Sequence, residues 1–475
     1  MNRSMTTMPH TTSMISRRRI LQTAGIGALP LGLPGMVAAG VDAKRGLGKG
    51  AAEKSCIFIL LCGGPSHLDT WDLKPEAPDT IRGPYQPIPT RVPGMRINEL
   101  HTRLATMTDR ICLIRSMSHV GNISNHFDAM HHILSGQAQA PADAPYIGSI
   151  LSKARPNDRG IAPYVWLIKC VGDPVFCAVN IGNGGHLGMM HSPLFVGSAT
   201  NHPALPTFTG PDELIAIVPP DRMQERRRLL DGLNPSASVI EGHRSTSDWQ
   251  ELHGRAFDLT SGSEGREPFE LHREPTSVRE RYGMHPLGQN LLLARRLVEN
   301  GVGFVTVNGW TGPSPNGGGG PPASSWDMHG GEMGMGNAFG NGSYGMGWCL
   351  PCLDEALTAL LTDLHDRGML DNTLVVVTGE FGRTPNINQN GAANPGRQHW
   401  PSCYSTILAG GGIRGGRVYG ESDKHGAYVK DKPVRPQDLG ATIFHSLGVP
   451  LDLRLSRDGF TRPLSTGEPL LDLFG

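Results

Sequence analysis

The sequence lacks a net charge, and charged residues of either sign are few. Lysine and arginine together number 43, aspartate and glutamate also number 43, and charged residues make up only 18% of the 475 residues. Binding to nucleic acid or to an anionic membrane surface needs a clear excess of basic residues. The composition therefore predicts no nucleic-acid partner.

Cysteine is also scarce for a chain of this length. Eight cysteines are too few for a fold held together by disulfides. Cys56, Cys62 and Cys112 lie in apolar runs, which favours buried free thiols. Cys349 and Cys352 have the spacing of a redox pair, but they open a predicted helix and do not follow a strand of a βαβ unit. A thiol-redox role stays open as an alternative function.

Long apolar runs are absent except near the N-terminus. Residues 16–22 read Ser-Arg-Arg-Arg-Ile-Leu-Gln, an apolar stretch follows over about 23–37, and the small residues 37–39 form a cleavage region. This order is typical of a twin-arginine export signal, although a basic disordered N-terminus is the alternative. Pro30 and Pro34 interrupt the stretch, so we expect no stable membrane span. We expect residues 1–39 to be a signal peptide and the mature protein to be periplasmic or secreted.

Apolar, β-branched runs recur through residues 40–475, which we expect to form one α/β domain. The runs are continuous, which is typical of parallel strands covered on both faces. Residues 291–300 and 353–367 between them have the periodicity of amphipathic helices. The sequence therefore predicts a mostly parallel central sheet with helices on both faces. The predicted strands are 56–62, 111–115, 164–168, 302–308, 373–378 and 404–409.

Two segments differ in composition from this predicted core. Residues 219–286 are polar and charged with few strand signals, which indicates a peripheral helical insertion. Residues 309–347 are dense in glycine, serine, proline and methionine. A loop of that length inside a compact domain is usually functional or mobile. We expect this glycine-rich loop to form part of the active site.

Histidine and acidic residues follow several of the predicted strands. The carboxyl ends of parallel strands meet at one edge of a sheet, and ligands bind there. Carboxylate and imidazole groups are the ligands that cations such as zinc prefer. For the segment with His67 and Asp69, which follows the first predicted strand, a turn with a surface histidine is the alternative. The candidate metal ligands are His67, Asp69, Asp327, His329, Glu380 and His399.

Three further residues are candidates for a catalytic role. Ser124 and Asn125 directly precede a predicted helix, 127–134, and side chains there face the positive end of the helix dipole. The alternative is that one of them only caps the helix. Arg383 lies three residues after Glu380 and suits an anionic substrate oxygen, although a salt bridge between these two side chains is the alternative.

The order of these motifs resembles the alkaline phosphatase and sulfatase superfamily. More narrowly, the chain looks like the twin-arginine-exported family called domain of unknown function 1501, over nearly all of its mature length. The resemblance implies an alkaline phosphatase-like fold and metal ligation by the candidate ligands named above, with Asp69 or His67 in the first position. The segments that carry it are GGPSHLDTWD (63–72), LSG (134–136), AFDL (256–259), LARRLVE (293–299), WDMH (326–329), GEFGRTP (379–385) and AGGG (409–412).

The resemblance implies a metal-dependent hydrolase of phosphate or sulfate esters, acting on an anionic ester or glycan. One or two divalent ions, zinc or calcium, would polarise the ester and activate Ser124 or a bound water. Arg383 or Asn125 would hold the anion. Because the twin-arginine pathway carries folded proteins, the metal would be loaded in the cytoplasm.

Two positions depart from the pattern of the superfamily. Glu380 and Phe381 stand where active enzymes usually have Asp-His, so an imidazole is missing. Counting back from residues 135–136 as in sulfatases places the nucleophile near His126, which is not a serine, threonine or cysteine. These departures favour the alternative function, a catalytically degenerate metal- or anion-binding protein with the same fold.

Overall fold

A computed structural model describes most of the chain beyond residue 52, and these residues belong to one unit, Leu47–Gly475. The predicted signal peptide, Cys170 and Cys177 lie outside the described residues. The described residues are 53–156, 160–168, 184–211, 214, 218–233, 254, 256–257, 259–260, 265–314, 326–333, 336–341, 345–388, 394–455 and 462–475.

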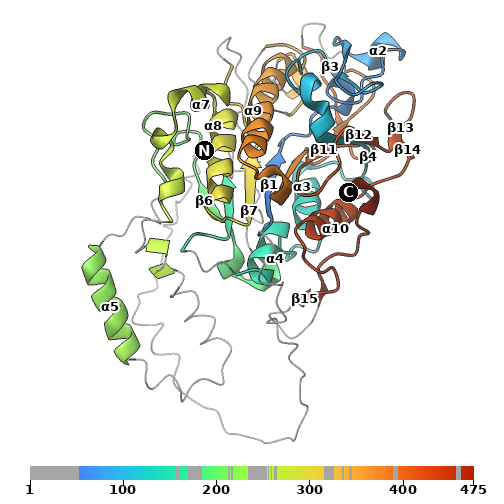
Figure 1. Ribbon diagram of the computed structural model, residues 1–475. Coiled ribbons are helices and arrows are strands. Elements are labelled where there is room, and N and C mark those ends of the chain that lie inside the picture. Colours follow the sequence, from blue (N-terminus) through green and yellow to red (C-terminus); the bar gives the residue numbers. More distant parts are fainter. Residues whose placement is uncertain are drawn as a thin grey trace, which may run out of the picture. The chain divides into compact units, whose positions relative to one another are not determined.

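An eight-stranded sheet forms the centre of this unit (Figure 1). Its strand order is β12 (Arg417–Tyr419), β4 (Ile111–Met117), β11 (Tyr404–Ala409), β8 (Thr373–Thr378), β1 (Ser55–Leu60), β7 (Phe304–Asn308), β5 (Tyr164–Leu167) and β6 (Leu194–Val196). β11 runs antiparallel to β4 and β8, whereas all other neighbouring pairs are parallel. The predicted α/β fold with a mostly parallel sheet is confirmed.

Helices cover both faces of the sheet (Figure 1). Successive residues of a strand point to opposite faces, so Ile57 packs in one hydrophobic layer and Phe58 in the other. Because both layers are apolar, every residue of β1 is buried, which explains its continuous apolar run. The first layer contains α8 (Pro286–Glu299) and α9 (Met346–Asp366), and the second contains α3 (His126–Ser135), α4 (Ile147–Ala154) and α10 (Pro436–Ser446).

The sequence patterns did not reveal the two edge strands or the direction of β11. β6 and β12 have three residues each, and two of the three in β12 are exposed, so neither forms a long buried run. All six residues of β11 are buried, as in the neighbouring parallel strands. Strand direction therefore leaves no mark in the apolar pattern of this segment.

The two segments of unusual composition carry no strand among their described residues. Residues 219–286 contain α5 (Pro220–Leu233) and α7 (Thr276–Arg281). Residues 309–347 are described in part and contain one 3-10 turn, Gly330–Met333, before α9 begins. In the part of the chain that the structure describes, no helix combines the length and the apolar character that crossing a membrane needs.

Smaller elements complete the fold around the edges of the sheet. A short helix, α2, spans Asp79–Arg82. Four two-stranded ladders pair β2 (Pro87–Pro89) with β3 (Arg96–Asn98), β9 (Gly382–Arg383) with β10 (His399–Trp400), β13 (Glu421–Ser422) with β14 (Val429–Asp431), and β15 (Arg454–Leu455) with β16 (Arg462–Pro463).

Candidate metal centre

Four side chains converge at the carboxyl edge of the sheet. Among the described residues, one group of side chains could hold a metal ion: His126, Asp327, His329 and His399. Each offers one ligand atom, and these four atoms lie within 4.8 Å of one another. His329 Nε2 is 2.7 Å from His399 Nε2, and His126 Nε2 is 3.3 Å from Asp327 Oδ2. Imidazole nitrogens with one carboxylate are a ligand set that suits zinc. We call this group the candidate metal centre.

The sheet topology explains why distant segments meet here. His126 begins α3 after β4, and Asp327 lies in the loop that follows β7. His399 comes before β11, not after a parallel strand. Because β11 is antiparallel, its first residue, Tyr404, pairs with Met117 at the end of β4. The start of β11 and the ends of the parallel strands therefore share one edge.

Main-chain contacts hold the loop of His329 against the segment that carries His399. The N–H of Arg397 donates to the carbonyl of Met328 at 2.7 Å, and that of Gly331 donates to Asn394 at 2.9 Å. A Cβ atom at Gly396 would collide with the main chain of Met328 and His329. This close approach requires glycine at position 396.

Arg383 orients Asp327 from the protein interior. Its Nη2 donates to Asp327 Oδ1 at 2.7 Å, and its side chain is fully buried. The same guanidinium donates to the carbonyls of Gly63, Gly64 and Arg397, with distances of 2.9 Å for Gly64 and 3.1 Å for Arg397. Its donors are thus directed at the main chain and at Asp327. Among the described residues, Arg383 forms no salt bridge with Glu380, which was the predicted alternative. Its side chain is also closed off from solvent.

The local electrostatics hold three of the four groups in the protonation state that binds a cation. Burial alone would raise the pKa of Asp327, but the positive charge of Arg383 and the bond to His126 outweigh it and hold that pKa well below its usual range. Burial, aided by Arg383, lowers the pKa of His399 to about 3. Burial likewise lowers the pKa of His329. The carboxylate is charged and both imidazoles are neutral, as metal ligands must be.

His126 is the exception, since it lies between two carboxylates. Burial lowers its pKa, but hydrogen bonds and charge attraction from Asp327 and Glu380 outweigh burial and raise the pKa to about 9. In the metal-free protein at neutral pH, His126 is therefore protonated and bridges both acids. A metal ion at the centre would replace the proton on Nε2.

The apolar ring of Phe381 packs against two of the imidazole rings. Its side chain is fully buried, and its ring centroid is 5.0 Å from that of His126 and 4.5 Å from that of His399. Gly64 has φ +70°, and a Cβ atom there would lie 2.6 Å from the Phe381 ring. The glycine pair after β1 therefore lets the backbone pass directly over this ring.

The other three predicted ligands lie outside the four-residue group. Asp69 is fully buried and paired with Arg397, with oxygen–nitrogen distances of 2.7 and 3.2 Å. His67 Nε2 is 2.7 Å from the carbonyl oxygen of Gly426. Glu380 Oε1 is 2.6 Å from His126 Nδ1, directly next to the group.

The residues before α3 take different positions from one another. Asn125 is the N-cap of α3, since its side chain accepts from the N–H of Asp128 at 2.9 Å. Ser124 is exposed, and its carbonyl accepts a hydrogen bond from His399 Nδ1 at 2.6 Å. The helix-capping alternative therefore describes Asn125, and the main chain of Ser124 orients a candidate ligand.

The sequence patterns missed His126 as a ligand. The only signal was its place at the start of a predicted helix, where the superfamily resemblance suggested a nucleophile. A histidine there adds a third imidazole to the group.

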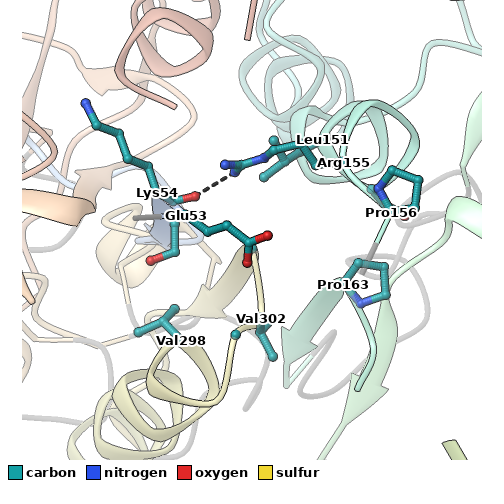
Figure 2. A pocket seen from close by; sticks show the side chains of 12 residues that line it. Glu53, Lys54, Leu151, Arg155, Pro156, Pro163, Val298 and Val302 are labelled. Carbon is teal, nitrogen blue, oxygen red and sulfur yellow. Dashed lines mark hydrogen bonds between the residues drawn. The ribbon is translucent and has the colours of Figure 1, made fainter. Parts of the chain in front are cut away.

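Neither the Cys349–Cys352 pair nor the cavity in Figure 2 belongs to this centre. Both cysteines are buried within α9, and burial raises the pKa of the Cys352 thiol, which disfavours thiol redox chemistry. The cavity of about 300 Å³ lies at the amino edge of the sheet, where Arg155 donates to the carbonyl of Lys54 at 2.6 Å (Figure 2).

Several solved structures are similar to this chain at low identity. The PsFucS1 sulfatase from Pseudoalteromonas sp. is 13% identical, with a TM-score of 0.34 over 84% of this chain and 68% of that one. The phosphonate monoester hydrolase SpPMH from Silicibacter pomeroyi is 13% identical, with a TM-score of 0.35 over 89% and 76%. The lipoteichoic acid synthase LtaP from Listeria monocytogenes is 11% identical, with a TM-score of 0.35 over 87% and 74%.

Such low TM-scores support no statement about the activity of this chain. No curated protein matches its sequence. A family model described as protein of unknown function (DUF1501) matches residues 53–473, nearly the whole of the chain after the predicted signal peptide. The chain therefore belongs to the DUF1501 family.

Proposed function

We propose that this protein is a metal-dependent hydrolase of phosphate or sulfate esters. The observation that supports the proposal most strongly is the convergence of His126, Asp327, His329 and His399 at the carboxyl edge of the sheet. Ligands of α/β proteins bind at this edge. The substrate class that fits a cationic centre is an anionic ester, including a sulfated or phosphorylated glycan.

The ligand chemistry favours a single zinc ion. Three imidazoles and one carboxylate match the donor types of zinc, whereas calcium takes six to eight oxygen ligands. When bound, the ion would need a fifth coordination position to take an anionic oxygen of the ester and polarise the bond to be broken. Arg383 keeps Asp327 in place, and the Ser124 carbonyl does the same for His399.

The attacking group in this proposal is water, not Ser124. An enzyme hydroxyl needs an adjacent base to become a nucleophile. Ser124 is exposed, and the part of the residue that contacts the centre is its main-chain carbonyl, which accepts a hydrogen bond from His399. Asn125 is engaged with Asp128 as the helix cap. Ser124 and Asn125 then support the centre through the main chain and the helix start.

The proposed site of action is the periplasm or the exterior of the cell. The twin-arginine motif at residues 16–22 supports this, and export after folding would allow metal to be loaded first. Cell fractionation tests it with the Arg17→Lys/Arg18→Lys variant. Export of the wild type and retention of the variant in the cytoplasm support the proposal. Retention of both forms in the cytoplasm refutes the proposed location, and unchanged export of both forms refutes the twin-arginine route.

Hydrolysis is tested by screening aryl phosphates and aryl sulfates with zinc, calcium or manganese added to chelator-treated protein. The diagnostic variant is His329→Ala, and its control is His191→Ala, a buried imidazole outside the centre. Turnover that His329→Ala abolishes and His191→Ala retains supports the proposal. A zinc-loaded wild type without turnover on any ester refutes hydrolysis.

A catalytically degenerate binding protein is the second candidate function. Ser124 contacts the centre through its main-chain carbonyl and not through its hydroxyl, and Phe381 supplies no ligand. The same screen separates the two functions. Zinc binding with affinity for inorganic phosphate or sulfate, but without turnover, supports the binding function.

A further inference from the structure

Glu380 lies next to the candidate metal centre without belonging to it. Its side chain is fully buried at the end of β8. Oε1 is 2.6 Å from His126 Nδ1 and accepts the N–H of Gly63 at 2.9 Å. Oε2 is also buried and has no hydrogen-bond partner among the described residues. This carboxylate therefore acts on the centre through one imidazole.

The chemistry of that contact determines the state of His126. An ionised carboxylate only accepts hydrogen bonds, so the proton of the contact belongs to His126 Nδ1. The other ring nitrogen, Nε2, faces Asp327 at 3.3 Å. With Nδ1 protonated, Nε2 is the nitrogen that can present its lone pair to a cation. The contact thus fixes both the tautomer and the rotation of the ring.

The same arrangement recurs at a second ligand. His399 Nδ1 donates to the Ser124 carbonyl at 2.6 Å, and a carbonyl likewise only accepts. His399 Nε2 is again the nitrogen that faces the centre, 2.7 Å from His329 Nε2. Two of the three imidazoles are oriented in this way, one by a neutral acceptor and one by a charged acceptor.

Glu380 is itself held in place from three sides. The N–H of Gly63, after β1, donates to its carboxylate. Its own carbonyl accepts from His119 Nε2 at 2.5 Å. The next residue, Phe381, packs against the ring of His126 with a centroid distance of 5.0 Å. A group fixed this firmly can transmit its orientation to the ring that it contacts.

We propose that Glu380 is a positioning residue, which sets the tautomer and orientation of His126 and strengthens metal binding without ligating the metal. The inference rests on the proposed metal centre. It replaces direct ligation by Glu380 with an indirect contribution. Carboxylate partners of ligating histidines typically change metal affinity by about 10–100-fold.

Zinc affinity, measured by competition with a chromophoric chelator, tests this inference independently of turnover. We expect Glu380→Gln to bind zinc about 10-fold more weakly and Glu380→Leu about 100-fold more weakly. The control is Glu274→Gln, because the Glu274 side chain is only 7% exposed but pairs with Arg295 and Arg296 in another part of the fold. This control should retain wild-type zinc affinity even if its stability falls.

A double-mutant cycle separates positioning from ligation. If Glu380 acts through His126, then Glu380→Gln has no further effect on zinc affinity in a His126→Ala background. The absorption bands of the cobalt-substituted Glu380→Gln variant should also stay at their wild-type wavelengths, because the ligand set is unchanged. An equal loss of affinity in both backgrounds, or wild-type affinity in both Glu380 variants, overturns the inference. A wild type that binds no zinc instead overturns the proposed function.

Discussion

Replacing Arg383 by methionine should destabilise the metal-free protein far more than the zinc-loaded protein. The Arg383–Asp327 pair has side-chain exposures of 0% and 2%, so neither charge can be solvated by bulk water. Breaking such a pair costs about 3–5 kcal/mol, because the remaining carboxylate is buried without its main partner. The carbonyls of Gly63, Gly64 and Arg397 also lose a donor, at about 1 kcal/mol each.

Zinc should offset the ion-pair part of this loss, because a divalent cation at the centre also compensates the charge of Asp327. The expected decrease in unfolding free energy is then about 6–8 kcal/mol with chelator, and about 3 kcal/mol with zinc. Urea denaturation followed by circular dichroism, in chelator and in saturating zinc, measures both values. The zinc-dependent difference is the diagnostic quantity.

The control for this experiment is Arg82→Met. Arg82 pairs with Asp79 at 2.5 Å, but the side chains are 46% and 85% exposed. A surface pair of this kind contributes less than about 1 kcal/mol. The reasoning is refuted if Arg383→Met costs no more than this control, or if zinc leaves its cost unchanged.

Three further results are expected. Ser124→Ala should retain turnover within a few-fold, because water is the proposed nucleophile; a complete loss measured on the best aryl ester would identify Ser124 as the attacking group. Asp69→Asn should lower stability by about 3–5 kcal/mol through its buried pair with Arg397 yet leave zinc content unchanged, and elemental analysis that finds zinc lost would make Asp69 a ligand. His285 caps α8 through Nδ1, and burial lowers its pKa to about 4, below the unfolded value. Its contribution is therefore complete above about pH 6.5 and is lost as the pH falls toward 4, a difference of roughly 3 kcal/mol that His285→Asn should remove from the pH dependence of unfolding.

The central sheet was predictable because burial on both faces leaves a direct record in the sequence. The run 373–378 corresponds to β8, and the periodic stretch 353–367 covers the second half of α9 and its C-cap. The edge strands left no such record, since three partly exposed residues do not form an apolar run. Strand direction also escaped prediction, because a buried antiparallel strand such as β11 has the same composition as its parallel neighbours.

The candidate site was predictable in its motifs but not in its pairings. Asp327, His329 and His399 were identified as candidates from their positions next to strands, and the structure brings them together. Which acid pairs with which base depends on three-dimensional packing. Asp69 lies against Arg397, 328 residues away in the sequence, and no spacing within either motif could indicate that contact.

The metal content of folded protein tests the central claim most directly. Protein purified after incubation with zinc and removal of excess ion is analysed as wild type, Asp327→Ala and His399→Ala, with circular dichroism to confirm folding. The account predicts one zinc per wild-type chain and little zinc in either variant. Equal and negligible zinc in all three folded proteins would contradict it.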